Sequence, residues 1–382
     1  MSKLSPFALI VTAALLAGSV TAQNLVLHNT LGNAAEVQNS VVGPNLGFTA
    51  GSTPPWVGGA ATIDYVAGLE GGALTVGPGS YGNGVGWHGV ILANPAAVID
   101  PEQGTIETVF CMRDAPTSGA GDRYHVFDGA YSVGSEFGIN LVDNGGAPNV
   151  TRLWCWLAMG GTFVDAKDLV DNGPGIALTN VVHQWFHVTF CWDRNGIDGS
   201  TDTLRVYLNG VLAAASQQND WGTTMPAQVE IGGNTDADIV GKLLVDDVKL
   251  WDAAKTNTVP PMRLHFSQPN GPGSIVVTET CGNPGDFKIA FLTFDAANAG
   301  AGFGTGWLAG LHIGIYDVMS QVFANVAPFN APLDARGNAI FTLPAGVLSG
   351  LAGSTIYGVA LSVTPGFGSI SKFSLPFGMT IN

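Results

Sequence analysis

A cluster of acidic and amide side chains occupies the stretch WDRNGIDGSTDTLRVYLNG, residues 192–210. Its oxygen-bearing members are Asp193, Asn195, Asp198 and Asp202. Side chains of this kind are the ligands that Ca²⁺ prefers. Read as an EF-hand loop from Asp193, however, the stretch has Asp198 where glycine is needed and Leu204 where a bidentate glutamate is needed. The same residues suit a polar corner of a sheet, between a strand that ends at Trp192 and a hairpin.

Two further clusters have the composition of a calcium loop. They are Asn234, Asp236 and Asp238, and Asp143 and Asn144 together with Asp165, Asp168 and Asp171. Aspartate and asparagine are also common in turns that bind nothing. We expect any Ca²⁺ to bind at residues 234–238, with an ordinary turn as the alternative.

Acid–base and nucleophilic motifs are absent from the sequence. Retaining glycosidases place two carboxyl groups about 5 Å apart, but Glu107 and Glu230 each stand alone in a strand-like run. Asp246 and Asp247 are adjacent, so a regular strand would point them to opposite faces. The chain has no G-x-S-x-G elbow, no H-E-x-x-H pair and no phosphate-binding loop. We therefore predict no catalytic residue.

Tryptophans in glycine-, proline- and asparagine-rich loops are candidates for stacking on a sugar ring. These are Trp56, Trp87 with the neighbouring His88, and Trp221. The alternative for each is a loop that packs its aromatic ring against its own sheet. Five other tryptophans lie in strand-like runs and are expected in the core: Trp154, Trp156, Trp185, Trp192 and Trp251.

The elements that must position these residues are short strands joined by tight turns. The segment 183–193 places apolar residues on both of its faces, which predicts a central strand that is covered on both sides. The segment 203–216 alternates around Asn209-Gly210, which predicts a two-residue hairpin turn. With strands expected at 104–113 and 242–252, the pattern predicts a sandwich of two antiparallel sheets.

The remainder of the chain also favours β-structure. Residues 256–262 (TNTVPPM) form a linker-like stretch, and residues 263–382 are expected to form a second, smaller β-sandwich. The uncharged stretch 299–316 has glycines four residues apart, but its six glycines disfavour a helix. We expect a glycine-rich loop that leads into a buried strand there, and not a membrane span.

The order of four motifs carries a resemblance to a known family. HQWFHVTFCWD, LRVYLNG, VEIGGN and GKLLVDDVKLWD follow one another between residues 183 and 252. This order resembles the concanavalin A-like, laminin G-type jelly roll, and the resemblance extends over about residues 24–255, in a domain expected at 23–255. It implies an all-β fold and a superfamily of carbohydrate-binding modules, adhesion modules, glycoside hydrolases and polysaccharide lyases. Residues 263–382 are similar to a β-sandwich appended to secreted planctomycete-type bacterial proteins.

The first 22 residues have the features of a secretory signal. Lys3 precedes an apolar run from Phe7 to Leu16, and a small-residue cleavage site ends at Ala22. We therefore expect a secreted or cell-envelope protein whose mature chain has no integral membrane segment. The formal net charge of −15 disfavours nucleic acid as a partner. Four cysteines could pair in three ways after export or stay as buried thiols: Cys111, Cys155, Cys191 and Cys281.

These observations favour an exported, non-catalytic protein that binds carbohydrate or cell-surface glycan through the jelly roll, with Ca²⁺ as the one cofactor to consider. One alternative is a structural or envelope protein that makes only protein contacts. Another is a divergent polysaccharide hydrolase or lyase, which would need two carboxylates, or a tyrosine and a histidine, converging in a groove.

Overall fold

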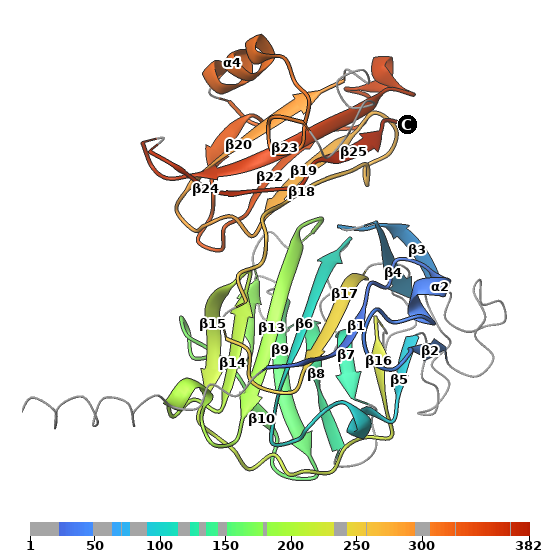
Figure 1. The fold of residues 1–382 in the computed structure, drawn as a ribbon, viewed down its shortest axis with the longest axis vertical. Coiled ribbons are helices and arrows are strands. Elements are labelled where there is room, and N and C mark those ends of the chain that lie inside the picture. The colour runs from blue at the N-terminus through green and yellow to red at the C-terminus, as the bar shows by residue number, and fades with distance from the viewer. Residues whose placement is uncertain are drawn as a thin grey trace, which may run out of the picture.

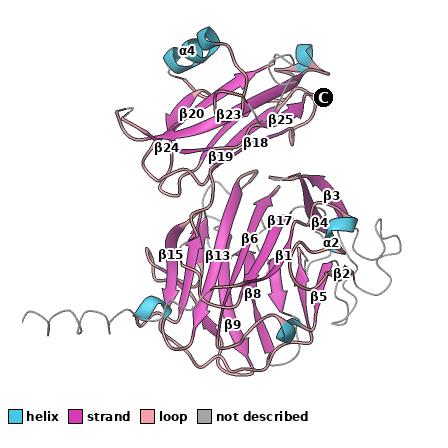
Figure 2. Cartoon of the chain, viewed as in Figure 1, coloured by secondary structure: helices cyan, strands magenta, loops and turns pink. Residues whose placement is uncertain are grey.

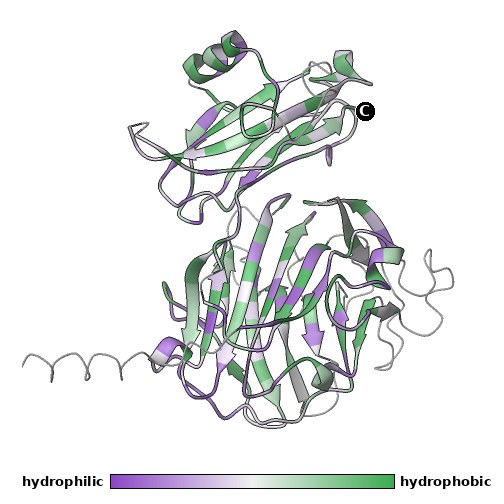
Figure 3. Cartoon of the chain, in the orientation of Figure 1, coloured by the Kyte–Doolittle hydropathy of each residue, from purple (hydrophilic) through white to green (hydrophobic). Residues whose placement is uncertain are grey.

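The computed structural model describes residues 23–48, 63–69, 71–76, 90–113, 123–129, 135–143, 151–178, 182–232, 243–256, 258–294, 306–324, 326–366 and 368–382. Strands dominate these residues and helices are few (Figure 2). Hydrophobic positions recur along the strands with polar ones interleaved, which is the pattern of sheets with one face in a core (Figure 3). Most of the predicted strands lie within the described residues, whereas the predicted signal (residues 1–22) and the predicted calcium loop (residues 234–238) lie outside them.

Two large sheets form the first unit (Figure 1). Within the described residues, sheet A has the order β11-β15-β14-β13-β6-β17-β4-β3, and β1 also pairs with β17. Its strands are β1 (Leu25–Asn29), β3 (Ile63–Ala67), β4 (Gly72–Val76), β6 (Gln103–Met112), β11 (Lys167–Asp168), β13 (Trp185–Asp193), β14 (Leu204–Leu208), β15 (Val211–Ser216) and β17 (Leu243–Trp251).

Sheet B packs against sheet A and has the order β10-β9-β8-β7-β16-β5-β2, with β12 on β9. Its strands are β2 (Gly47–Phe48), β5 (Val90–Ala93), β7 (Arg123–Gly129), β8 (Ser135–Asp143), β9 (Thr151–Met159), β10 (Val164–Asp165), β12 (Ile176–Leu178) and β16 (Gln228–Ile231). Short helical turns join some of these strands: α2 (Ala34–Val37), η1 (Pro95–Ala97) and η2 (Ile197–Gly199).

Strand β13 confirms the prediction of a central strand. Phe186, Val188 and Phe190 face the core between the sheets, and Phe186 stacks on Phe110 with 5.4 Å between ring centroids. The opposite face of β13 is buried as well. The turn after β14 is also as predicted, because Asn209 (φ 54°) and Gly210 (φ 84°) both have the positive φ that a type I′ hairpin needs.

A second, smaller unit follows the first. A three-stranded sheet contains β18 (Arg263–Ser267), β19 (Ile275–Thr280) and β22 (Ala339–Leu343). A five-stranded sheet contains β20 (Phe287–Thr293), β21 (Asn330–Pro332), β23 (Thr355–Val363), β24 (Ile370–Phe373) and β25 (Phe377–Thr380). One apolar cluster fills the space between the two sheets. The chain is therefore all-β, with a large two-sheet sandwich followed by a smaller one.

One element of the second unit differs from the prediction. In the described part of the 299–316 region, residues 306–316, the expected strand is not formed. Residues 315–324 form helix α4 (Ile315–Ala324), which lies over the outer side of the five-stranded sheet (Figure 1). The glycines end at Gly314, and Val318 and Val322, four residues apart, then pack on that sheet. A short turn, η3 (Ser349–Leu351), precedes β23. Among the described residues, no helix has the length and apolarity to cross a membrane.

The two units contact each other through buried polar groups at the end of sheet A where β13 begins. Thr280 Oγ1 donates to the carbonyl of Trp185 (3.0 Å), and Asn209 Nδ2 donates to Asn338 Oδ1 (2.8 Å). The segment expected to be a linker does not stand free of the first unit, because Thr258 is buried and its hydroxyl lies 3.1 Å from that of Thr189. This segment therefore packs on the outer face of sheet A, and the second unit contacts the end of that sheet where β13 begins (Figure 1).

Candidate functional site

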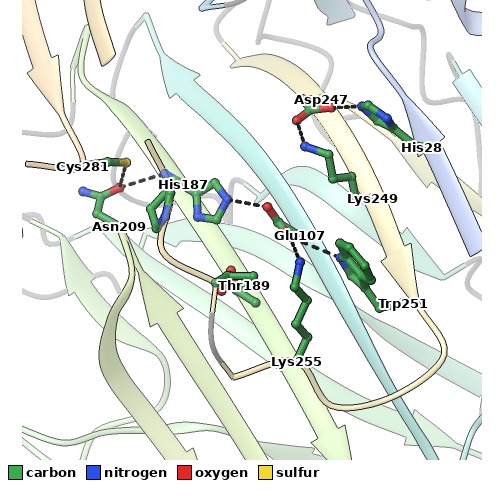
Figure 4. Close-up of polar contacts among 12 residues, drawn as sticks. His28, Glu107, His187, Thr189, Asn209, Asp247, Lys249, Trp251, Lys255 and Cys281 are labelled. Atoms are coloured by element: carbon green, nitrogen blue, oxygen red, sulfur yellow. Dashed lines mark hydrogen bonds and ion pairs between the residues drawn. The ribbon is translucent and has the colours of Figure 1, made fainter. Parts of the chain in front are cut away.

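The outer face of sheet A carries a network of charged side chains (Figure 4). Glu107 on β6 lies 3.0 Å from His187 Nε2 on β13 and accepts a hydrogen bond from Trp251 Nε1 (3.2 Å). Lys255 extends over the Trp251 ring, 3.3 Å from its centroid, and also faces Glu107. Burial raises the pKa of Glu107, but the bond and charge of His187, with the two lysines nearby, outweigh it and leave that pKa lowered.

The same face is covered by the chain itself. Thr105 Oγ1 donates to the carbonyl of Ala253 (2.8 Å), and Cys191 Sγ lies 3.1 Å from the carbonyl of Lys255. Glu107, His187 and Lys255 are therefore paired with one another next to residues 253–256, which cover this part of the face. We assign to this network the role of fixing the segment that leads to the second unit.

A β-bulge on sheet A overturns one prediction from the sequence. Asp246 and Asp247 were expected on opposite faces of β17, but Asp247 has φ 56° and the register shifts between Asp246 and Val248. Asp247 therefore lies on the outer face with Lys249, and its Oδ1 is 2.6 Å from His28 Nε2. Asp246 lies on the same outer face, opposite Val109, and accepts a hydrogen bond from the Leu69 amide (2.8 Å).

The pKa values of Asp246 and Asp247 are shifted in opposite directions. Burial, with the charges of Asp247 and Glu36, raises the pKa of Asp246 to about 8. Burial also acts to raise the pKa of Asp247, but the hydrogen bond from His28 and the charge of Lys249 outweigh it and lower that pKa. At neutral pH the bulge therefore holds one protonated and one ionised carboxyl group.

The outer face of sheet B offers a different arrangement. A row of residues crosses the sheet from β16 to β10: Glu230, Asp128, Gly138, Trp156 and Asp165. Directly opposed residues in an antiparallel pair have Cα atoms about 5 Å apart and side chains on the same face. Glu230 and Asp128 therefore lie side by side, although they are a hundred residues apart in the sequence.

The next row on sheet B adds an imidazole, an amide and a second indole. His125, Asn140 and Trp154 are opposed across β7, β8 and β9. His125 forms an ion pair with Asp128, and Asn140 Nδ2 donates to Asp128 Oδ2 (3.3 Å). Because a carboxylate only accepts, this bond fixes the orientation of the Asn140 amide and turns its Oδ1 away from Asp128.

Two buried polar atoms on this face have no hydrogen-bond partner within the described residues. They are Asn140 Oδ1, an acceptor, and Trp156 Nε1, a donor. Buried polar groups in folded proteins are nearly always paired, so such atoms call for a partner that the described residues do not supply. Trp156 also stacks on Phe163 (6.1 Å between centroids), and the Phe163 side chain is 47% exposed. An acceptor, a donor and aromatic surface thus occur together.

Most of the ligand-binding and calcium-binding residues predicted in loops lie outside the part of the chain that the structure describes. Trp56, Trp87, His88, Asn234, Asp236 and Asp238 lie outside the described residues. The described strand ends that flank them, Phe48, Val90 and Ile231, are paired neighbours at one end of sheet B. In the part of the chain that the structure describes, no group of three or more histidine, cysteine, aspartate or glutamate side chains is placed to hold a metal.

Trp221 is a correction to the predicted ligand-binding residues. It is fully buried in the core of the first unit, and its Nε1 donates to the carbonyl of Pro101 (2.9 Å). Arg194 lies over its ring at 4.6 Å from the centroid. The loop carries Trp221 inward because its indole has both an apolar cavity to fill and a carbonyl to bind, so no ligand can stack on it.

The strand tryptophans are also corrected in part. Trp156, Trp185 and Trp192 are buried as predicted, whereas Trp154 and Trp251 are only partly buried. Trp192 lies between the sheets, but Trp154 and Trp156 lie on the outer face of sheet B, because Leu153, Cys155 and Leu157 take the inward positions of β9. Trp185 and Trp251 lie on the outer face of sheet A. The cysteines are four buried free thiols, and burial raises the pKa of Cys111 and of Cys191 to about 12.

Sequence reasoning missed the row on sheet B because its members are not close in the sequence. Glu230 and Asp128 form no linear pattern, and only the pairing of β16 with β7 brings them together. The available signal was alternation: Val229 and Ile231 are apolar on either side of Glu230, which places the glutamate on the outer face.

Comparison with known proteins agrees with the architecture. Residues 88–258 match the family model of the concanavalin A-like lectin/glucanases superfamily. No curated protein matches the chain.

Solved structures with a similar fold are distant. Domain 4 of AbnA, an extracellular GH43 arabinanase from Geobacillus stearothermophilus solved with arabinotriose, has a TM-score of 0.37 and 20% identity, over 61% of this chain and 94% of that one. The binding domain of botulinum neurotoxin serotype G has a TM-score of 0.42 and 10% identity, over 94% and 79%. The match to the family model confirms, over residues 88–258, the resemblance to the concanavalin A-like superfamily inferred from the ordered motifs.

Proposed function

We propose that this protein is an exported, non-catalytic carbohydrate-binding protein that recognises a glycan on the outer face of sheet B. The observation that carries the proposal is the unfilled acceptor of Asn140 beside the unfilled donor of Trp156. A sugar hydroxyl both donates and accepts, so a single ligand group can satisfy each of these atoms.

The neighbouring side chains support the same ligand. Asp128 and Glu230 are acceptors for further hydroxyls when ionised. The half-buried indole of Trp154 and the exposed ring of Phe163, which stacks on Trp156, offer surface on which the apolar face of a sugar can pack. The outer face of sheet A is less suited to a ligand around Glu107, because Glu107 is paired with His187 and Lys255 beneath the chain's own segment.

A glycan array with the full mature chain tests the proposal, run in Ca²⁺ and again in EDTA. Binding to a defined set of glycans in either condition is the expected result. Loss of that binding in EDTA would support the calcium site predicted at residues 234–238. Absence of binding to every glycan in both conditions would refute the carbohydrate-binding function.

A second candidate function has one specific observation in its favour. The paired positions of Asp128 and Glu230 meet the geometric need of a hydrolase for two neighbouring carboxyl groups. A lyase is less well supported, since Tyr124 faces the core while His125 faces outward. Incubating the bound polysaccharides with wild type, Asp128→Asn and Glu230→Gln distinguishes the functions. Release of reducing ends by wild type alone, with no unsaturated sugar formed, would identify a hydrolase, whereas unchanged polysaccharide in all three supports a binding protein.

A further inference from the structure

A cavity of about 690 Å³ lies where the two units meet. Cys111, His183 and Trp185 line it from the first unit, and His265 and Phe377 line it from the second. Ligand sites are commonly found in such clefts between domains, and their volumes run from about 300 to 1,000 Å³. This cavity is separate from the outer face of sheet B, because no residue of β7, β8 or β9 lines it.

Three rings form one wall of the cavity. The His265 ring meets Trp185 edge-on, with 5.6 Å between centroids and 71° between planes, and lies 4.9 Å from the Phe377 ring. Two exposed polar residues, Arg113 and Asn270, also line the cavity and mark its mouth, where it opens to solvent. The cavity therefore has an aromatic wall and polar residues at its opening.

His265 brings an unsatisfied hydrogen-bonding atom to this wall. The residue is 4% exposed, and its Nε2 has no partner among the described residues. The carbonyl of Gly68 hydrogen-bonds the ring, and burial lowers the pKa of His265 to about 4, so the imidazole is neutral at pH 7. A carbonyl can only accept, so the single N–H of the neutral ring faces Gly68 and Nε2 is an acceptor.

We propose that the cavity between the two units binds a hydroxylated six-membered ring, whose hydroxyl donates to His265 Nε2 while its face packs on Trp185 and Phe377. Both a pyranose sugar and a phenol have this chemistry. A ligand held here contacts both units, so its binding also stabilises their contact.

The test is a titration of the full mature chain, labelled with ¹⁵N-histidine, with phenol and separately with a set of methyl pyranosides. The ring signal of His265 is assigned by its loss in His265→Phe. The expected result is that the Nε2 signal of His265 moves with at least one probe. Movement with a pyranoside identifies a sugar site, and movement with phenol alone identifies a phenolic one.

Variants make the result decisive. Asn270→Trp places an indole at an exposed position of the cavity lining and should weaken binding at least about fivefold by blocking entry. His265→Phe should weaken binding to a similar extent, because it removes one hydrogen bond. Trp156→Phe, on sheet B, should leave the titration unchanged, so failure here is distinguishable from failure of the proposed glycan face. No movement of the His265 signal with any probe, or equal affinity in Asn270→Trp, would overturn the inference.

Discussion

The carboxyl group of Asp246 gives a quantitative test of the bulge on β17. In Asp246→Asn the side chain still offers an oxygen to the Leu69 amide, but it no longer carries a proton that can be lost. In the wild-type protein the pKa of Asp246 is raised from 3.8 to about 8, chiefly by burial. Between these two values the folded protein keeps the proton that the unfolded chain has released.

The sign and size of the effect follow from proton linkage. When the folded state binds one more proton than the unfolded state, stability falls as the pH rises, by about 1.4 kcal/mol per pH unit for one group. Asp247, Glu36 and Lys249 face Asp246 in both proteins, so their contributions largely cancel in a comparison. The stability of Asp246→Asn relative to wild type should therefore increase by about 1.4 kcal/mol for each pH unit between about pH 5 and pH 7.

Urea unfolding followed by tryptophan fluorescence at pH 5, 6 and 7 measures this difference. Asp64→Asn, which removes an exposed acid from β3, two strands away from β17 in sheet A, is the matched control and should show no such slope. A difference between Asp246→Asn and wild type that stays constant across this range would show that Asp246 is ionised in the folded protein. The reasoning about the bulge would then be wrong.

Three further predictions concern buried groups. Trp221→Ala should destabilise the first unit by about 3–5 kcal/mol, because it empties a core site, and a urea midpoint equal to that of wild type would argue against the buried position. Ellman's reagent should find no reactive thiol in the native protein and four after denaturation; a native protein that reacts at once would contradict four buried thiols. Lys288→Met should destabilise the second unit by about 3–5 kcal/mol, because it leaves the buried carboxylate of Glu279, 2.6 Å from Lys288 Nζ, without its cation. The double variant Lys288→Met/Glu279→Gln should recover most of that loss in the same assay.

Local patterns predicted much of the fold. The strand at Trp185–Asp193 and the turn at Asn209-Gly210 follow from alternation and turn chemistry, which depend on neighbours in the chain. The bulge at Asp247 was missed because one extra residue in a strand leaves no local signal, and it moved a carboxylate to the other face. Helix α4 was missed because Leu311 and Ile313 suggested a strand that would run on through Ile315.

The candidate site was less predictable than the fold. Trp221 stands among turn residues, and nothing in its own segment reveals that Pro101, 120 residues away, offers it a carbonyl in the core. Glu230 and Asp128 become neighbours only through the order of strands in sheet B. Pairings between distant strands depend on the packing of the whole sandwich, so reasoning from single segments could not supply them.

The most direct test of the central claim compares two conservative variants by calorimetric titration with the glycan that binds best on the array. Trp156→Phe and Trp251→Phe each remove one indole N–H from the outer face of a sheet, the first from sheet B and the second from sheet A. We predict that Trp156→Phe weakens binding about fivefold, the value of one hydrogen bond, and that Trp251→Phe binds as wild type does. Equal affinity in Trp156→Phe and wild type, with a loss in Trp251→Phe, would place the glycan on sheet A and contradict the account.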